Sequence, residues 1–419
     1  MKAPIPLLDN LEHLENPFRH SVKLNPTVIE RIKRSTEAHT SELQISAQFL
    51  YSYRGSRDTF ATYRREIERL LQWCWFIEEI LLTDVKRQHF ERYVEFCQRP
   101  PSSWIGIKNV PRFLDSTGIE PRAVNSEWKP FVAKIDKRQF KNGRRANKQD
   151  FELSGSALQG LFSVCSSFFN YLIQEEYLEQ NPVSQIRQKS KFIRKQQGTS
   201  PIRRLSNQQW GAILNQINRL ADLEQDNPRF ERMLFVMTAL FALYLRISEL
   251  VESPRWQPRM SDFWKDSSDH WWFTTVGKGN KQRDISVSDQ MMVALHRYRL
   301  FLGLTKYPLP GESYPLLPKT RGKGGISSTR QVRNIVQEAF DLAIEQLISE
   351  GNTESAESLK LATVHWLRHT GISEDVKSRP REHVRDDAGH GSSAITDRYI
   401  DVERVERNES AKLKPVTPQ

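Results

Sequence analysis

The sequence is poor in cysteine and has no long hydrophobic run. Its 419 residues include only Cys74, Cys97 and Cys165, with no close pair. This spacing argues against a disulfide scaffold and against a zinc finger. The longest apolar stretch, Met233 to Leu245, spans 13 residues, which suits a core helix and is too short for a membrane-spanning one. The first 17 residues show no basic-then-apolar signal pattern. We therefore expect a cytoplasmic protein.

The common motifs of metal, nucleotide and dinucleotide chemistry are also missing. The sequence has no HExxH, no CxxC, no P-loop and no GxGxxG. His365 and His369 share one face of a predicted helix, but no acidic third ligand is nearby. We therefore expect no bound metal and no cofactor.

Acidic residues are outnumbered, since 62 Lys and Arg face 51 Asp and Glu, a net charge of +11. Two runs hold much of the excess. Residues 134–148 contain seven basic residues and one acid, and residues 187–204 contain seven basic residues and no acid. One such run can be a solvated loop, but two in a basic chain favour nucleic acid as the partner. The DNA-binding candidates are Lys137, Arg138, Lys141, Arg144, Arg145, Lys189, Lys191, Arg194 and Lys195.

Apolar residues at three- and four-residue spacing predict a mainly helical chain. Helical spacing runs through residues 41–97, and further helices are expected at 27–35, 157–177, from Ser206 onward, 229–250, 289–302, 330–349, 364–372 and 394–399. The one clear strand signal is a hairpin of residues 270–276 and 282–288 around the turn Gly-Lys-Gly-Asn-Lys.

The length predicts two or three domains. We expect an irregular N-terminal extension at 1–40 and a helical domain at 41–186 with an insertion at about 100–150. A basic linker would follow at 187–204, and a second domain at 205–419. Residues 253–268 lengthen the segment before the hairpin.

An ordered set of six residues occupies the second domain: Arg246, Lys278, His365, Arg368, His390 and Tyr399. A single HxxR pair carries no weight, because the pairs at 89–92 and 296–299 lack such neighbours. The whole set resembles the catalytic domain of the tyrosine recombinases, the phage integrase family. Residues 156–186, an apolar helix followed by Asn-Pro, look like the end of that family's core-binding domain.

The resemblance implies a fold and an activity. The fold is that of a two-domain DNA-breaking-rejoining enzyme, mainly α with a small β-hairpin or sheet. It has a core-binding domain at 41–186 and a catalytic domain at 205–419. The activity is site-specific recombination or integration of double-stranded DNA through a 3′-phosphotyrosyl intermediate. A homotetramer would hold two DNA sites, and accessory DNA-bending or directionality proteins could assist. Neither metal nor ATP is needed.

The chemistry of phosphodiester exchange explains the residue types. Arg246 and Arg368 can clamp the phosphate with permanently charged donors. Tyr399 would be the nucleophile, and cationic neighbours favour its phenolate, whose ordinary pKa is about 10. The resemblance assigns proton donation to the leaving 5′-hydroxyl to the hairpin lysine, Lys278, with Lys281 as the alternative.

The remaining roles are supporting ones. His365 is expected as a general acid/base or phosphate partner and His390 as a second hydrogen-bond donor. Glu249, one turn after Arg246, is expected to orient the site. Tyr244 departs from the family pattern, because a small residue often stands before the Leu-Arg pair.

Two other functions remain open on the sequence. A type IB topoisomerase shares the tyrosine chemistry, but it carries a long helical linker before its nucleophile. A DNA-binding regulator of the same fold without activity would not need the full catalytic set. The tail after Tyr399 can form a short amphipathic helix over 401–412. That helix could dock on its own catalytic domain or on a neighbouring subunit.

Overall fold

The fold is described from a computed structural model. The structure describes residues 3–16, 21–33, 37–115, 122–186, 203–225, 227–277, 279–397 and 411–412. The chain divides into two compact units, Met1–Thr199 and Ser200–Gln419. Most of the second basic run (187–202) and most of the tail after residue 397 lie outside the described residues.

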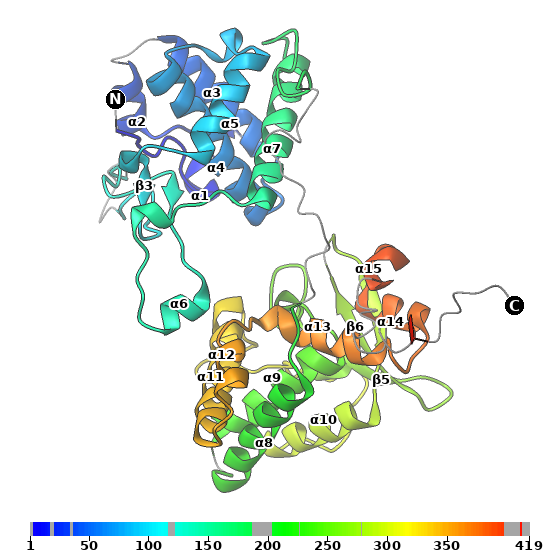
Figure 1. The fold of residues 1–419 in the computed structure, drawn as a ribbon. Coiled ribbons are helices and arrows are strands. Elements are labelled where there is room, and N and C mark those ends of the chain that lie inside the picture. Colours follow the sequence, from blue (N-terminus) through cyan, green and yellow to red (C-terminus); the bar gives the residue numbers. More distant parts are fainter. Residues whose placement is uncertain are drawn as a thin grey trace, which may run out of the picture. The chain divides into compact units, whose positions relative to one another are not determined.

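Unit 1 is a bundle of helices with two pairs of very short strands (Figure 1). Its elements are α1 (Leu11–Leu14), β1 (Glu15–Asn16), β2 (Ser21–Val22), α2 (Pro26–Lys33), α3 (Glu37–Tyr51), α4 (Arg57–Trp73), α5 (Arg87–Gln98), β3 (Ile105–Gly106), β4 (Phe131–Val132), α6 (Lys137–Lys141) and α7 (Gly155–Gln174). β3 and β4 pair in parallel, and β1 and β2 pair antiparallel. Cys74, Cys97 and Cys165 are free and buried in the core of this unit.

The first forty residues are more than an irregular lead-in. Leu7, Leu8 and Leu14 are almost fully buried in the same core as α3, α4 and α7. The carboxylate of Glu68 on α4 also accepts hydrogen bonds from the backbone amides of Leu7 and Leu8. These contacts attach the N-terminal segment to unit 1, so it packs as part of that unit and does not extend from it.

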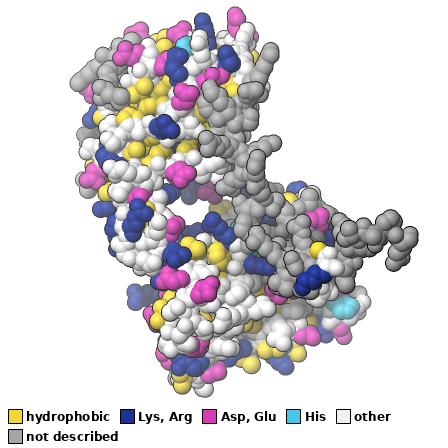
Figure 2. Space-filling model, viewed as in Figure 1, with side chains coloured by type: hydrophobic (Ala, Val, Ile, Leu, Met, Phe, Trp, Pro, Cys, Tyr) yellow, Lys and Arg dark blue, Asp and Glu magenta, His cyan; other side chains and the backbone are white. Residues whose placement is uncertain are grey.

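The insertion at about 100–150 contains an arm, residues 134–150, with α6 near its tip (Figure 1). Its base is fixed by the hydrogen bond from Ala133 N to Gly106 O and by the packing of Phe151 on Phe131. Within the arm, Arg144 forms an ion pair with Asp150 at 2.5 Å. The arm contains seven Lys and Arg residues, and some of its blue side chains are visible on the face in Figure 2. The first basic run is therefore an ordered projection.

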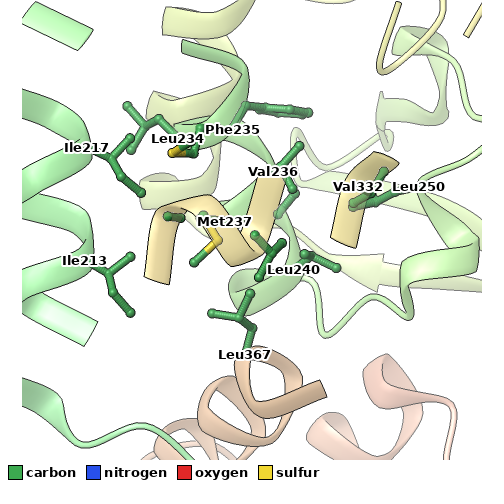
Figure 3. Packing of buried hydrophobic residues seen from close by; sticks show 14 of the residues in the cluster. Ile213, Ile217, Leu234, Phe235, Val236, Met237, Leu240, Leu250, Val332 and Leu367 are labelled. Carbon is green, nitrogen blue, oxygen red and sulfur yellow. The ribbon is translucent and has the colours of Figure 1, made fainter. Parts of the chain in front are cut away.

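Unit 2 is built around α9, whose side chains contact its neighbours on several sides. Its helices are α8 (Asn207–Leu223), α9 (Pro228–Ala242), α10 (Asp289–Phe301), α11 (Thr329–Ser349), α12 (Thr353–Leu359), α13 (Val364–Asp375), α14 (Arg381–Ala388) and α15 (Ser393–Asp397). Figure 3 shows Leu240 of α9 close to Leu367 of α13, and Ile217 of α8 facing Leu234. A capping box of Ser206 and Gln209 starts α8 where the sequence predicts a helix from Ser206 onward.

The predicted helix over 229–250 is wrong in its last turns. α9 ends at Ala242, and Tyr244 takes a left-handed backbone conformation with φ of 49°. A left-handed residue cannot continue a right-handed helix. Arg246 instead precedes a 3₁₀ turn, Ile247–Glu249. The break turns the chain just before the first candidate catalytic residue.

The predicted hairpin is present and belongs to a three-stranded antiparallel sheet, β5-β6-β7. β6 (Trp271–Val276) pairs with β7 (Gln282–Ser286), and β5 (Phe263–Lys265) pairs with the other edge of β6. The segment 253–268 thus supplies a strand that the sequence did not predict. α12 and α14 were also not expected. The predicted fold class, mainly α with a small sheet, is confirmed. No described helix is long and apolar enough to cross a membrane.

Candidate active site

Arg246 and Glu249 form one half of the site. The backbone amide of Arg246 donates to Glu249 Oε2 at 2.9 Å, and its Nη1 donates to Oε1 at 3.1 Å. The Glu249 side chain is 1% exposed, whereas that of Arg246 is 30% exposed. The carboxylate therefore holds the guanidinium from beneath and leaves part of it open to a ligand.

Arg283 on β7 holds Glu249 from the other side. Its Nη1 and Nη2 donate to the two Glu249 oxygens at 2.9 Å each, and its Nε donates to the Asp387 carbonyl at 2.9 Å. Burial acts to raise the pKa of Glu249, but the hydrogen bonds from Arg283 and Arg246 outweigh it and hold the pKa below the ordinary value. Glu249 is thus a carboxylate at neutral pH, and its contacts with Arg246 are those that an orienting residue would make.

Arg368 on α13 forms the other half of the site and is almost fully buried. Its Nη1 donates to the Tyr244 carbonyl and its Nη2 donates to the Ala388 carbonyl at 2.6 Å. The left-handed turn at Tyr244 therefore has two consequences. It ends α9 before Arg246, and it directs a carbonyl oxygen at the second arginine.

His365 and His390 lie in the field of both arginines. Burial, then Arg368 and Arg246, lower the pKa of His365. The same causes, in the same order, lower the pKa of His390 to about 4. Nδ1 of His390 lies 2.9 Å from the Thr396 hydroxyl. The structure thus brings Arg246, His365, Arg368 and His390 into one region, with both imidazoles neutral at neutral pH.

Lys278 and Tyr399 lie outside the described residues. Gly277, which precedes Lys278, is described and lies against the site. A Cβ atom added to Gly277 would stand 3.1 Å from Glu249 Oε1 and 3.4 Å from Arg246 Nη1. Such contacts are tight, so the absence of a side chain at residue 277 lets the hairpin lie this close to Arg246 and to its supporting carboxylate, Glu249.

A polar network joins the elements that carry these residues. The Tyr244 hydroxyl donates to Asp375 on α13 and accepts from Arg379 at 2.9 Å. Arg379 also donates to Asp387 on α14 at 2.6 Å, and Asp387 accepts from the Ser286 hydroxyl at 2.6 Å. The network ties α13, α14 and β7 to the turn before Arg246.

Sequence reasoning missed Arg283, Asp387 and Thr396 as supporting residues. A signal for Arg283 was available, because it alternates with the buried Ile285 and so faces inward on its strand. An inward-facing arginine needs a buried acceptor. Asp387 and Thr396 gave no comparable signal, since only the tertiary fold places them beside Ser286 and His390.

The described DNA-binding candidates lie on the arm of unit 1. Arg138, Arg144 and Arg145 are exposed, and Lys137 and Lys141 are partly exposed on α6. The other candidates, Lys189, Lys191, Arg194 and Lys195, lie outside the described residues. Among the described residues, no group of three or more His, Cys, Asp or Glu could hold a metal ion.

Comparisons with known proteins find relatives of one kind. The chain is 23% identical over 259 residues to a tyrosine recombinase XerC of Caldanaerobacter subterraneus, covering 60% of this chain and 61% of the relative. It is 23% identical over 251 residues to the XerC of Chlorobaculum parvum, covering 56% of this chain and 66% of the relative. The matched region thus spans less than two thirds of each relative. No protein-family model matches the chain.

The fold resembles that of a solved recombinase. A structure of the XerH site-specific recombinase bound to a palindromic difH substrate superimposes with a TM-score of 0.53 at 14% identity, covering 99% of both chains. A likeness at this identity concerns the fold. The sequence relatives and this fold together confirm the resemblance that the six ordered residues predicted: the chain is related to the tyrosine recombinases.

Proposed function

We propose that this protein is a site-specific DNA recombinase that cleaves and rejoins strands through a 3′-phosphotyrosyl intermediate. The observation that carries the proposal is the convergence of Arg246, His365, Arg368 and His390 in unit 2, beside the hairpin that bears Lys278. Two guanidinium groups beside two neutral imidazoles suit a phosphodiester, because they stabilise negative charge that develops on its non-bridging oxygens.

The proposed reaction is a pair of transesterifications. The phenolic oxygen of Tyr399 attacks the phosphorus, and the bond from phosphorus to the 5′-oxygen breaks. Lys278 donates a proton to the leaving oxygen, and the neutral His365 accepts the phenolic proton. The phosphotyrosyl ester retains the bond energy of the phosphodiester, so a new 5′-hydroxyl can reverse the step without ATP. Neither direction requires a metal ion.

A suicide DNA substrate tests this function directly. A nick close to the cleavage site makes the released fragment, which bears the 5′-hydroxyl, short enough to diffuse away. Rejoining is then prevented, and the covalent intermediate accumulates. We expect protein attached to the 3′-phosphate on denaturing gels, in excess EDTA and without ATP. An adduct that forms only with added divalent metal would contradict the mechanism. A type IB topoisomerase would also form the adduct, but it would relax supercoiled plasmid without a specific site, whereas an inactive regulator would form none.

The arm is proposed to contact DNA phosphates without reading bases. Replacing Arg138 and Arg145 by Ala should weaken binding to the target site and to unrelated DNA by similar factors. The slope of log Kd against log salt should fall by about 0.9 for each lost phosphate contact. Fluorescence anisotropy at several salt concentrations measures both effects. Arg57 and Arg87, exposed on other helices of unit 1, give a matched control pair. Equal slopes for the two pairs of substitutions would show that these arginines of the arm do not contact DNA phosphates.

The family resemblance supports a homotetramer holding two DNA sites, working on DNA in the cytoplasm at the nucleoid. Accessory DNA-bending or directionality proteins belong to the same proposal. The relatives do not distinguish integration from excision or from resolution of DNA dimers. Inverted repeats beside the coding region would identify the natural sites.

The tail is proposed to link neighbouring subunits. Truncation after Asp401 should leave binding to one DNA site nearly intact but impair assembly of the paired-site complex and recombination. The short amphipathic helix that the sequence predicts over 401–412 needs another surface to be stable. Native gels and sedimentation with one-site and two-site DNA measure the effect. Normal tetramers of the truncated chain would refute docking between subunits, and loss of the folded monomer would show docking within one chain.

A further inference from the structure

A cluster of buried arginines in unit 1 has no part in the function proposed above. It lines a cavity of about 700 Å³ between the segment before α1, helix α4, and the stretches 109–113 and 128–134. The arginines whose side chains are largely buried around this cavity are Arg64, Arg69, Arg112 and Arg122. Buried guanidinium groups are normally paired with carboxylates, because burying an unpaired charge has a desolvation cost on the order of several kcal/mol.

Three of these arginines have their own carboxylate. Arg69 pairs with Glu66, Arg112 with Glu68, and Arg122 with Asp9. These carboxylates are already engaged, since Glu66 is shared with Arg65 and Glu68 also accepts two backbone amides. Of the three carboxylates, only Asp9 also acts on the fourth guanidinium, that of Arg64, and it does so at longer range.

Arg64 is the arginine whose nearest counter-charges, Asp9 and Glu12, act on it without pairing with it directly. It is 8% exposed, its Nη1 donates to the neutral Asn10 side chain at 2.9 Å, and its guanidinium lies 5.5 Å from the ring centre of Phe60. Its Nε is buried and has no hydrogen-bond partner among the residues that the structure describes. Within the described part of the chain it makes no ion pair. Burial lowers the pKa of Arg64 to about 10. The Nε of Arg122 is also buried, and no described residue accepts a hydrogen bond from it.

We propose that this cavity binds a small anion that carries a phosphoryl group, held by Arg64 together with Arg112 and Arg122. Guanidinium groups present planar pairs of donors that match phosphate oxygens. The volume lies within the range of small-molecule sites, about 300–1,000 Å³. A compact anion fits better than a DNA backbone, because the backbone of a duplex runs along a surface and Arg64 is only 8% exposed.

The site has a structural consequence. Asn10 lines the cavity from the N-terminal segment, and Lys134 lines it from the root of the basic arm. A bound anion therefore bridges both segments to α4. This inference does not depend on recombinase activity, and its test uses no DNA cleavage.

Calorimetric titration of the full chain with inorganic phosphate and with adenosine monophosphate, at constant ionic strength in chloride, tests the site. We expect saturable binding that Arg64→Met weakens at least about tenfold, the effect of one lost charged hydrogen bond. Arg87→Met, which removes an exposed arginine paired with Glu91 on α5, should bind as the wild type does. Absence of saturable binding to the wild type, or equal binding to Arg64→Met, overturns the proposal.

Melting in phosphate-free buffer separates a ligand site from a structural arginine. Arg64→Met keeps most of the packing volume and removes a buried charge that no direct ion pair offsets, so it should melt at or above the wild-type temperature. Phosphate should then raise the melting temperature of the wild type alone. A variant that melts lower, with phosphate raising both proteins equally, would make Arg64 a structural residue. Stabilisation of the wild type by duplex DNA alone, without any response to phosphate or the nucleotide, would also overturn the small-anion assignment.

Discussion

Tyr399→Phe is expected to abolish covalent attachment to DNA while DNA binding stays close to that of the wild type. The change removes one oxygen, the proposed nucleophile, and keeps the ring. Loss of a nucleophile typically costs at least about 10⁴-fold in rate. Arg246 and Arg368 remain to hold the phosphate, so affinity should change little. Denaturing gels with the suicide substrate report the adduct, and anisotropy at fixed salt reports binding.

Tyr307→Phe is the matched control. Tyr307 lies in unit 2, is 48% exposed, and stacks on Trp271 through its ring. Removing its hydroxyl keeps that stacking, so adduct formation should be unchanged. A persistent adduct in Tyr399→Phe would move the nucleophile to another residue. Loss of the adduct in both variants would show that the assay reports stability rather than chemistry.

Local signals predicted the helices and the hairpin well. The capping pair of Ser206 and Gln209 lies at the expected start of α8, and the expected hairpin ranges 270–276 and 282–288 contain β6 and β7. These patterns work because capping and periodicity depend on residues close in sequence. The candidate site came from a different kind of signal, the resemblance of six ordered residues to a family pattern, and the structure describes four of the six.

Other features depend on contacts between distant segments and gave no local signal. Tyr244 continues an apolar helical pattern, so the break after Ala242 was not visible in the sequence. In the fold, the Tyr244 side chain is held by Asp375 and Arg379, more than 130 residues away along the chain. Those contacts stabilise a backbone conformation that an aromatic residue rarely adopts. The same break supplies the carbonyl that Arg368 needs.

Arg283→Met is expected to destabilise unit 2 and to slow cleavage. Glu249 would keep its contacts with Arg246 but lose two hydrogen bonds at 2.9 Å. Breaking a buried ion pair costs about 3–5 kcal/mol, and thermal melting measures that loss. Arg246 would then no longer be held in place by a fixed carboxylate. A misplacement of about 1 Å costs about 100-fold in rate, which single-turnover cleavage below the melting temperature measures.

The pH dependence of stability gives an independent signature of the ion pair between Arg283 and Glu249. In the wild type the pKa of Glu249 lies below its ordinary value. Its contribution to stability is therefore present above the ordinary pKa and is lost as the pH falls through the lower folded value. Without Arg283, burial dominates and raises the pKa, so the charged carboxylate becomes destabilising. Melting of Arg283→Met should therefore improve as the pH falls toward the ordinary carboxylate range, opposite to the wild type.

Arg297→Met is the control that separates positioning from stability. Arg297 donates three hydrogen bonds to the buried Glu231 in the same unit, on helices that carry none of the proposed catalytic residues. The Arg297→Met substitution should lower the melting temperature without slowing cleavage by the folded protein. Adding Glu249→Gln to Arg283→Met removes the buried charge that Arg283 no longer offsets, so stability should partly return while cleavage stays slow. Wild-type cleavage by folded Arg283→Met, or equal slowing by Arg297→Met, would show that Arg283 does not position Arg246.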